Sequence, residues 1–483
     1  RRCSDDDVEA LMASWLLGTA FMMIHVLGMV SAVMALMSSR TPQGAVAWII
    51  SLLTFPYIAL PAYWFFGRPR FYGYVTARGA KDTVLRRVLV RYRHNIKPHV
   101  VESTNTDIKA VEQLAMMPLT RGNHPQLLID GQATFDSLFE GIAQAQHYLL
   151  LQFFIVRDDA LGRELQQHLV SAAKRGVRVY FLYDEIGSRK LRDGYFKELK
   201  QAGVEVTPFR SSRGIKHRFP LNFRNHRKIA VVDGEQGWVG GFNVGTEYLG
   251  QSKKHGPWRD THLLLNGPSV LGLQEAFWED WHWATGEVIT LNWHASPAAG
   301  HDQQVVIVPS GPADKQDTAG LLVQQLIHSA NERFWVTSPY FVPDQGVQDS
   351  LRLAAMRGVD VRVMIPERPD HLLVFLSAFS FLPEMLKAGV KIYRYQPGFL
   401  HQKVMLIDNS SSAVGTVNLD NRSFRLNFEI TAFIPSADFT QQVAEMLEAD
   451  FAQCRRVTLD EVSQRPMWKK VVSRAAYLMS PVQ

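Results

Sequence analysis

One pattern of histidine, lysine and aspartate occurs twice in the sequence and constrains the fold more than any other feature. The pattern is His-x-Lys-x4-Asp, and its two copies are 175 residues apart. The first copy consists of His226, Lys228 and Asp233, and the second of His401, Lys403 and Asp408. Asn243 follows the first copy and Asn418 the second, again 175 residues apart. This ordered series indicates an internal duplication.

Each copy lies in the same succession of predicted helices and short apolar strands. The predicted strands of the first half are Tyr148–Val156, Val177–Tyr183, Val204–Phe209 and Lys228–Val232. Those of the second half are Phe334–Val342, Val359–Ile365, Val390–Tyr395 and Lys403–Ile407. Helices that alternate with nearly continuous apolar strands are typical of a sheet covered on both faces. We therefore predict two α/β/α halves, joined near Thr290–Gln303.

Within each copy the histidine and the lysine are two residues apart. On a strand, residues i and i+2 point to the same face, so both side chains of a copy are predicted to face one cavity. A single His-x-Lys pair would more simply be two residues of an edge strand, but the duplication favours catalysis. Asp233 and Asp408 belong to the candidate catalytic set, although their place at the strand ends suits fixing a turn or a lysine better than acting as a base.

Two apolar stretches precede the duplicated region. They cover residues 11–37 and 45–66, and each is long enough to cross a hydrocarbon core, which takes about 20 helical residues. The seven-residue loop Ser38–Gly44 predicts a transmembrane hairpin with both ends on one side. Pro56 and Pro61 would be tolerated in a membrane helix. A signal peptide and a buried core hairpin are the alternatives.

The positive charge of the chain is concentrated in one window. Its formal net charge is +6, and residues 68–100 hold nine Lys or Arg and one acid. The positive-inside rule places this window, and the globular part after it, in the cytoplasm, and the window is predicted to lie against anionic headgroups. A solvated basic helix is the alternative. The two cysteines, Cys3 and Cys454, exclude a disulfide framework and a cysteine-rich zinc site.

With both motifs, each accompanied by Gly-x-x-Asn, residues 121–483 resemble the phospholipase D superfamily. The apolar hairpin, the run from Asn225 to Lys228 and the run from Tyr340 to Asp344 are similar to bacterial cardiolipin synthases. The resemblance implies two tandem phospholipase D-like α/β/α domains in a pseudo-twofold arrangement, at 121–296 and 297–483. A transmembrane hairpin (1–67) and a basic juxtamembrane linker (68–120) would precede them. It also implies a multi-pass protein of the bacterial inner membrane with cytoplasmic catalytic domains.

Phosphodiester cleavage explains why these residue types are needed. Two lysines and two asparagine amides supply hydrogen-bond donors to the charged phosphate oxygens: Lys228, Lys403, Asn243 and Asn418. One histidine must be neutral to attack phosphorus, and the other must be protonated to assist the leaving alkoxide. Clustered cations favour the loss of one proton, and the two histidines are expected to titrate as a coupled pair. This chemistry requires no metal or other cofactor.

The resemblance also implies individual roles. His226 would be the nucleophile that forms a phosphatidyl-histidine, and His401 the general acid and later the base, although the sequence leaves their order open. Asp260 and Glu429 fit the acids that orient the imidazoles; surface or structural carboxylates are the alternative. Three basic residues in or beside a loop could hold a lipid phosphate, the alternative being an exposed loop: Lys216, Arg218 and Arg224.

The implied reaction takes two phosphatidylglycerol molecules to cardiolipin and glycerol. The expected partners are phosphatidylglycerol and anionic membrane lipid, with no nucleic acid, and a homodimer is a further expectation from the family. A phospholipase D-type hydrolase is one alternative. A nuclease is another, but it would call for an exposed basic groove with aromatic platforms. A non-enzymatic membrane scaffold is the third, although it would need none of the duplicated polar residues.

The two halves differ at one predicted helix. The first half has a charged stretch at residues 189–200, whereas the second half has the apolar run 372–382. This run is predicted either to dip into lipid headgroups or to be an ordinary core helix.

Overall fold

The computed structural model describes residues 5–39, 41–67, 83–209, 223–252 and 256–483. Contacts divide the chain into two units. Of the described residues, one unit holds 5–39, 41–67 and 223, and the other holds 83–209, 224–252 and 256–483.

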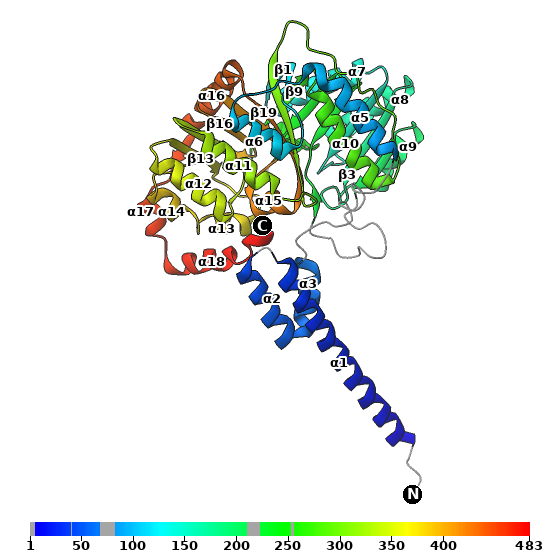
Figure 1. Cartoon of the computed structure of the whole chain (residues 1–483), viewed down its shortest axis with the longest axis vertical. Helices are drawn as coiled ribbons and strands as arrows, with labels where there is room; N and C mark the ends of the chain where they lie inside the picture. Colours follow the sequence, from blue (N-terminus) through cyan, green and yellow to red (C-terminus); the bar gives the residue numbers. More distant parts are fainter. Residues whose placement is uncertain (1–4, 40, 68–82, 210–222, 253–255) are drawn as a thin grey trace. The chain divides into compact units, whose positions relative to one another are not determined.

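Within its described residues, the N-terminal unit contains three apolar helices, α1 (Asp5–Ser38), α2 (Pro42–Thr54) and α3 (Pro56–Phe66). Both short helices pack against α1, and the buried side chains between them include Ala35, Leu52 and Leu60 (Figure 1). The approach is close at Gly28, where a Cβ atom would lie 2.6 Å from the carbonyl oxygen of Leu52. Within α1, the segment Met12–Ser38 is long and apolar enough to cross a membrane.

The second predicted span, 45–66, is not one helix. The chain leaves the helical conformation at Phe55 (φ −133°, ψ 58°). Pro56 has no N–H to donate and disfavours the helical conformation of the residue before it, so α2 ends there and α3 begins. With 13 and 11 residues, each is shorter than the roughly 20 residues of a straight span. Among the described residues, α1 is the one helix that meets this length.

In the part of the chain that the structure describes, the second unit is built on one sixteen-stranded sheet. Fifteen of its strands follow one another in a continuous order. This order is β4 (Glu205–Phe209), β3 (Arg178–Asp184), β2 (Tyr148–Phe153), β6 (Ile229–Val232), β7 (Gln236–Gly240), β9 (Thr261–Asn266), β1 (Thr120–Ile129), β10 (Gln303–Ser310), β19 (Asn427–Ile434), β17 (Ser411–Gly415), β16 (Val404–Ile407), β11 (Arg333–Thr337), β13 (Asp360–Pro366), β14 (Lys391–Tyr395) and β20 (Cys454–Arg456).

Strands β2, β3 and β4 are parallel to one another, as are β11, β13 and β14. The remaining neighbours in this order pair antiparallel. The pairing of β1 with β10, with Thr120 opposite Val305, joins a first region, the strands from β4 to β1 in this order, to a second region, the strands from β10 to β20. Every residue of β2 and of β19 is buried, as expected of apolar strands covered on both faces. The prediction of a mixed α/β fold is therefore confirmed.

Helices connect and cover the strands (Figure 1). Those before or among the strands of the first region are α5 (Thr83–Ile96), α6 (Thr106–Ala115), α7 (Asp130–Gln144), α8 (Ala160–Lys174), α9 (Asp193–Gln201) and α10 (Val270–Thr285). Those of the second are α11 (Thr318–Ser329), α12 (Gln345–Met356), α13 (Leu372–Ala378), α14 (Leu382–Lys387), α15 (Asn421–Arg425), α16 (Ala437–Ala452), α17 (Leu459–Ser463) and α18 (Met467–Tyr477). Several begin at side-chain caps; for example, Asp159 accepts from the N–H of Gly162 and Asp344 from that of Val347.

Two predicted strands are shorter than expected. The run 148–156 ends its strand at Phe153, and the run 334–342 divides into β11 and β12 (Phe341–Val342). Strand β12 leaves the main sheet and pairs with β18 (Leu419–Asp420). The basic window 68–100 is described only from residue 83 onward, where it forms α5 and a 3-10 turn at Lys97–His99.

Two short strand pairings link the regions and position the duplicated motifs. Strand β5 (Arg224–Asn225) pairs in parallel with the start of β19, and β15 (Phe399–Leu400) pairs in parallel with β8 (Trp258–Arg259). The segment that leads into each histidine is therefore bonded to a strand from the other region.

Candidate active site

His226 and Lys228 lie between β5 and β6, and His401 and Lys403 lie between β15 and β16. The prediction that these residues lie on strands is wrong in detail, because the regular ladder starts one residue after each lysine. The backbone N–H of His226 donates to the carbonyl of Phe428 at 2.9 Å, and that of His401 donates to the carbonyl of Arg259 at 2.8 Å.

Each histidine pairs with a carboxylate from the other half of the sequence. Nδ1 of His226 lies 2.8 Å from Oε2 of Glu429, and Nδ1 of His401 lies 2.5 Å from Oδ2 of Asp260. All four side chains are buried. Phe428 and Arg259 accept the backbone N–H groups of the two histidines, and Glu429 and Asp260 are the next residues along the chain. The pairings of β5 with β19 and of β15 with β8 therefore produce this crossed arrangement. Neither Nε2 atom has a hydrogen-bond partner among the described residues.

The two lysines are buried and bend back onto their own motifs. Nζ of Lys228 donates to the carbonyl oxygen of His226 at 2.6 Å, and Nζ of Lys403 donates to that of His401. Burial lowers the pKa of Lys228 to about 7, and the charge of Lys403 adds to this effect. Burial likewise lowers the pKa of Lys403 to about 8. Two buried ammonium groups with depressed pKa values favour an anionic ligand, which would offset their cost of burial.

Both imidazoles favour the neutral form. Burial lowers the pKa of His226 to about 4, and the charges of Lys228 and Lys403 act in the same direction. The pKa of His401 falls well below its usual value, first through burial and then through Lys403, Lys228 and His226. Each histidine thus responds to charges from both motifs, as expected for groups gathered in one site.

The two carboxylates that pair with the histidines differ in their surroundings. Oε1 of Glu429 accepts from Oγ of Ser423 at 2.7 Å and from Nδ2 of Asn427 at 3.1 Å. Burial opposes its ionisation, but the pairing with His226 outweighs burial and lowers the pKa of Glu429, and the charge of Lys228 acts in the same direction. Asp260 accepts from the N–H of Thr261 at 2.8 Å. Burial raises the pKa of Asp260 to about 6, despite the opposing charge of Lys403.

The aspartates of the motifs are turn residues. Both have left-handed backbone conformations, with φ of 54° at Asp233 and 51° at Asp408. Their carboxylates accept backbone N–H groups from the segment before the neighbouring strand. Asp233 binds those of Gln146, His147 and Tyr148, and Asp408 those of Asn331, Glu332 and Arg333. These hydrogen bonds suit the fixing of a turn, the role that the sequence favoured for both residues, and their place in the catalytic set stays a prediction.

The residue between histidine and lysine anchors each motif to the protein. Nη1 of Arg227 contacts Asp280 at 3.0 Å, and its Nε donates to the carbonyl of Glu429 at 3.1 Å. Nε2 of Gln402 donates to Asp450 at 3.0 Å and to Thr261 at 3.1 Å. Sequence reasoning did not single out either residue, although both occupy the same position of a duplicated motif.

The two asparagines are buried at the ends of the Gly-x-x-Asn segments. Oδ1 of Asn243 accepts the N–H of Ile155 at 3.0 Å, and its Nδ2 donates to the Tyr248 hydroxyl at 2.9 Å. Oδ1 of Asn418 has no hydrogen-bond partner among the described residues. Asn243 is therefore held in place and has one further amide hydrogen to offer, whereas the amide of Asn418 is less engaged.

Aromatic rings surround the two histidines unequally. Ring centroids of Trp258, Phe399 and Tyr248 lie 5.4, 6.0 and 6.1 Å from that of His401. Phe154 lies 5.0 Å from His226, and Nζ of Lys228 lies 5.6 Å from the centroid of the same ring. These rings exclude water from the imidazoles. They were not identified from the sequence, because isolated aromatic residues carry no pattern.

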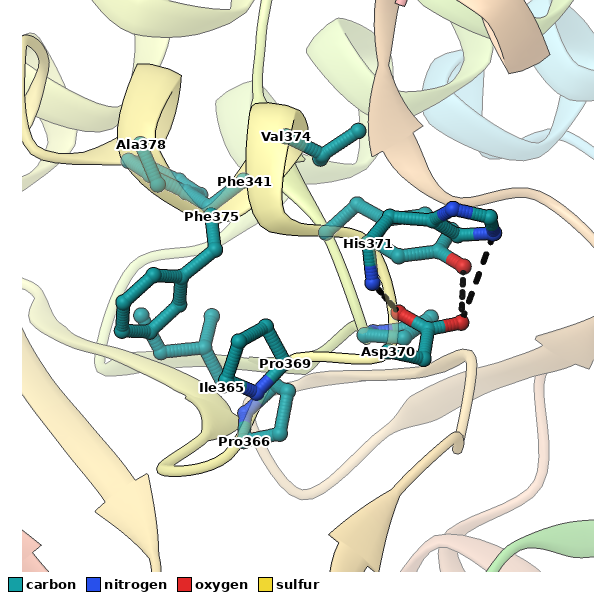
Figure 2. A pocket seen from close by; sticks show the side chains of 11 residues that line it. Phe341, Ile365, Pro366, Pro369, Asp370, His371, Val374, Phe375 and Ala378 are labelled. Carbon is teal, nitrogen blue, oxygen red and sulfur yellow. Dashed lines mark hydrogen bonds and ion pairs between the residues drawn. The ribbon is translucent and has the colours of Figure 1, made fainter. Parts of the chain in front are cut away.

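The carboxylate of Asp370 also affects the pKa of His401. The Tyr340 hydroxyl donates to Oδ2 of Asp370 at 2.7 Å, and the N–H of His371 donates to Oδ1 at 2.7 Å. Figure 2 shows Asp370 and His371 beside the hollow lined by Val374 and Phe375 of α13. The charge of Asp370 opposes the lowering of the pKa of His401. Within the sequence, the similarity of the run that begins at Tyr340 was the only related signal.

Of the three basic residues of the predicted lipid-phosphate site, the structure describes Arg224. Arg224 lies in β5, and burial lowers its pKa. Lys216 and Arg218 lie outside the described residues. In the part of the chain that the structure describes, no cluster of three or more His, Cys, Asp or Glu side chains is suited to hold a metal ion.

Comparison with known families gives two matches. The family described as "Cardiolipin synthase, PLD-like domain" matches residues 138–258 and 323–451, which include both motifs. The family described as "Phospholipase_D-nuclease N-terminal" matches residues 15–68, which include most of α1 and all of α2 and α3.

Individual relatives match along nearly the whole chain. Cardiolipin synthase A of Pseudomonas putida is 46% identical and covers 95% of this chain and 96% of its own. Cardiolipin synthase A of Pseudomonas aeruginosa is 45% identical, with 99% and 98% covered. Among solved structures, the phosphatidylserine synthase of Haemophilus influenzae has a TM-score of 0.60 at 14% identity, covering 78% of this chain and 100% of its own. That likeness supports the fold.

Proposed function

The chain belongs to the cardiolipin synthases of the phospholipase D superfamily, and from this premise we propose how its residues carry out the reaction. As a cardiolipin synthase the protein is a phosphatidyltransferase. The substrates we propose are two molecules of phosphatidylglycerol, which yield cardiolipin and glycerol. The crossed pairing of each histidine with a carboxylate of the other half is the observation that carries the mechanism.

In the first step, Nε2 of His226 attacks the phosphorus of one phosphatidylglycerol. A nitrogen–phosphorus bond forms while the bond from phosphorus to the glycerol oxygen breaks, and His401 gives its proton to that oxygen. Glycerol leaves, and the phosphatidyl group remains on His226. In the second step, His401 takes the proton of a hydroxyl of the second phosphatidylglycerol, whose oxygen attacks phosphorus and releases His226.

The electrostatics favour this order of roles. Glu429 has a lowered pKa, so it stays ionised and keeps its hydrogen bond to Nδ1 of a neutral, nucleophilic His226. Asp260 has a pKa raised to about 6, so the His401–Asp260 pair retains an additional proton to higher pH. A carboxyl proton shared across the 2.5 Å contact can be delivered through the imidazole. A bound phosphodiester also offsets the lysine charges, which raises the proton affinity of His401.

Lys228 and Lys403 stabilise the charge that builds on the phosphate oxygens during both steps. The amides of Asn243 and Asn418 add neutral donors, with Asn243 held by Tyr248. Asp233 and Asp408 act at a distance, by fixing the turns after β6 and β16. Lys216, Arg218 and Arg224 remain candidates for holding the lipid headgroup.

We further propose the wider organisation. Residues 121–296 and 297–483 form two phospholipase D-like halves related by an approximate twofold axis, which the crossed contacts support. Residues 1–67 anchor them to the membrane, with α1 as one limb and α2 with α3 as a broken second limb. The basic segment 68–120 lies on the cytoplasmic surface of the inner membrane. A homodimer remains part of this proposal.

The test uses the purified full chain in mixed micelles with labelled phosphatidylglycerol. The wild type should release one glycerol for each cardiolipin, while His226→Ala and His401→Ala should form neither. Labelled lipid should attach covalently to the wild type after denaturation and to neither variant, because the first step also needs the proton that His401 gives to glycerol. Cardiolipin from either variant would refute the two-histidine mechanism. Phosphatidic acid as the main wild-type product would identify a hydrolase instead.

A further inference from the structure

Helix α18 exposes large apolar side chains, which a helix in water normally buries. Its small residues Ser473 and Ala476 are buried, at 3% and 5% exposure. Its large apolar residues point outward, with Met467 73%, Trp468 64% and Val471 60% exposed. A surface helix ordinarily turns its apolar stripe toward the core and its polar residues toward water.

The exposed side chains form a continuous stripe. Met467, Val471 and Leu478 are spaced by four and seven residues, and Trp468 and Val472 form the adjoining row four residues apart. Residues at these spacings lie on one side of a helix. An apolar stripe of this extent, outward on every turn of α18, marks an interaction surface.

Helix α13 extends this apolar surface. The two helices pack against each other and lie side by side at one edge of their unit (Figure 1). Leu372 and Leu373 at the start of α13 are exposed, whereas Phe381 and Leu382 at the end of the apolar run are buried. The first residues of this run therefore face outward and its last belong to the core, and insertion of the run into headgroups stays a prediction.

Basic side chains border the stripe. Lys469, Lys470 and Arg474 belong to α18 itself, and Arg465 precedes it. The guanidinium of Arg465 lies 3.5 Å from the ring centroid of Phe379 and donates to Oγ of Ser473 at 3.3 Å. It makes no ion pair with a carboxylate among the described residues. Burial, together with the charge of Arg394, lowers the pKa of Arg465, so an anion at this position would be stabilising.

Two hollows open beside α18. One, of about 420 Å³, has apolar walls from Phe375, Phe379, Trp468 and Val472, with Arg465, Lys469 and Glu461 at its polar side. The other, of about 360 Å³, lies among α14, α17 and α18 and is lined by more basic than acidic side chains: Lys387, Arg465, Lys470 and Arg474, with Asp460. An apolar hollow beside unpaired or exposed cations suits an amphiphile with an apolar chain and an anionic head.

We infer that the outward stripe of α18, the start of α13 and the bordering cations form a membrane-docking surface for a bilayer that contains anionic phospholipid. The stripe enters the interfacial region, with Trp468 at headgroup level, and the cations bind lipid phosphates. The charge pattern favours this occupant over a second copy of the chain, since an apolar surface bordered by cations would meet the same cations on that copy.

The surface adjoins the candidate active site through α13. Phe375 lines both the larger hollow and the one in Figure 2, and the latter also contains Asp370, which acts on His401. A lipid held at the docking surface would thus lie next to the rim of the site. The inference concerns membrane contact and stands independently of the proposed reaction.

Spin labelling of the full chain tests it. In a Cys3→Ser, Cys454→Ser background that still makes cardiolipin, nitroxides are attached at Val471→Cys and, as a control, at Leu353→Cys on α12, which is 53% exposed. The protein is placed in nanodiscs of phosphatidylglycerol and phosphatidylcholine. The label at 471 should collide several-fold more with oxygen than with a water-soluble nickel complex, and the label at 353 should show the reverse. Replacing phosphatidylglycerol by phosphatidylcholine should reduce the preference at 471.

Three outcomes would overturn the inference. The label at 471 could be as accessible to nickel as the label at 353. It could be shielded from both reagents with dipolar coupling between chains, which would indicate a second copy. It could be shielded from both without such coupling, which would indicate cover by the chain itself.

A rate measurement adds an independent check. The pair Trp468→Glu and Val471→Glu should lower the initial rate on phosphatidylglycerol vesicles at least tenfold and leave the rate in mixed micelles unchanged. The matched pair Leu353→Glu and Met356→Glu on α12 should change neither rate. Equal rates of the α18 pair and the wild type on vesicles would contradict membrane docking by α18.

Discussion

His226 and His401 are held by the same backbone architecture and yet differ in their electrical surroundings. Each follows a two-residue strand that pairs with the other half, and each meets the carboxylate at the end of that pairing. Glu429 is ionised and receives two side-chain donors, while Asp260 has a pKa raised to about 6. Duplication thus supplies two equivalent positions, and the residues around the carboxylates give them different proton affinities.

Replacing the histidines should give the largest effects and the sharpest contrast. His226→Ala and His401→Ala should each lower cardiolipin formation on the order of 10⁴-fold or more, as for residues that act as one catalytic unit. A phosphatidyl ester of 4-nitrophenol separates the two roles, because its leaving group needs no proton. His401→Ala should then release a burst of one nitrophenolate per enzyme and stop. His226→Ala should release none.

The burst assay also tests the assignment itself. If the burst appeared in His226→Ala and was missing in His401→Ala, the nucleophile and the acid would be exchanged. The wild type, measured in parallel with phosphatidylglycerol as acceptor, provides the rate of an uninterrupted cycle.

Replacing the carboxylates that pair with the histidines should produce the next largest loss of activity. Glu429→Gln and Asp260→Asn keep the size of each side chain, but each should lower kcat/KM by about 10³-fold, because an amide no longer favours the required tautomer or charge of its histidine. With the nitrophenyl ester, Asp260→Asn should recover its burst to within about tenfold of the wild type. Glu429→Gln should stay slow. Equal recovery of both variants would contradict the division of roles.

Replacing the lysines should show the difference between the two motifs in the pH dependence of kcat/KM. Lys228→Met and Lys403→Met should each lower kcat/KM by about 10²-fold, the effect of removing one donor to developing charge. In the wild type, kcat/KM should fall as pH rises through about 7, where Lys228 loses its proton. Lys403→Met removes a charge that lowers the pKa of Lys228, so the fall should move to higher pH. In Lys228→Met it should follow Lys403, near pH 8.

A pH profile of kcat/KM for the three proteins checks this prediction, because that ratio reports the free enzyme. An alkaline limb at the same pH in all three would show that neither lysine controls it. The value of kcat at saturating lipid serves as the internal reference.

The mixed α/β fold and the residues of each motif could be predicted from the sequence, because periodicity and repetition are visible in the order of residues alone. The sequence did not predict that Glu429 meets His226 and Asp260 meets His401. Sequence distance relates each carboxylate to the histidine of its own half, whereas the pairing of β5 with β19 and of β15 with β8 depends on how the halves pack.

Two other features show where local reasoning failed. Hydropathy predicts one apolar helix over residues 45–66 because it does not register a backbone constraint, but Pro56 ends α2 through the conformation of Phe55. The sequence of α18 has an ordinary amphipathic composition, so it does not predict an outward apolar side. Only the packing of Ser473 and Ala476 against the protein shows that the apolar side faces outward.

Replacing Asp233 or Asp408 should give the smallest effect on catalysis. Unlike the replacements of Glu429 and Asp260, these two should have nearly the same effect in both halves. Asp233→Ala and Asp408→Ala each remove an acceptor of several backbone N–H groups at a left-handed residue, which should cost about 1–3 kcal/mol of stability. The kcat of the folded protein should stay within about tenfold. Asp→Gly at each position relieves the backbone strain and isolates the lost hydrogen bonds. Thermal unfolding and kcat are measured together, and a 10²-fold loss of kcat at an unchanged unfolding midpoint would support a direct catalytic role for these residues.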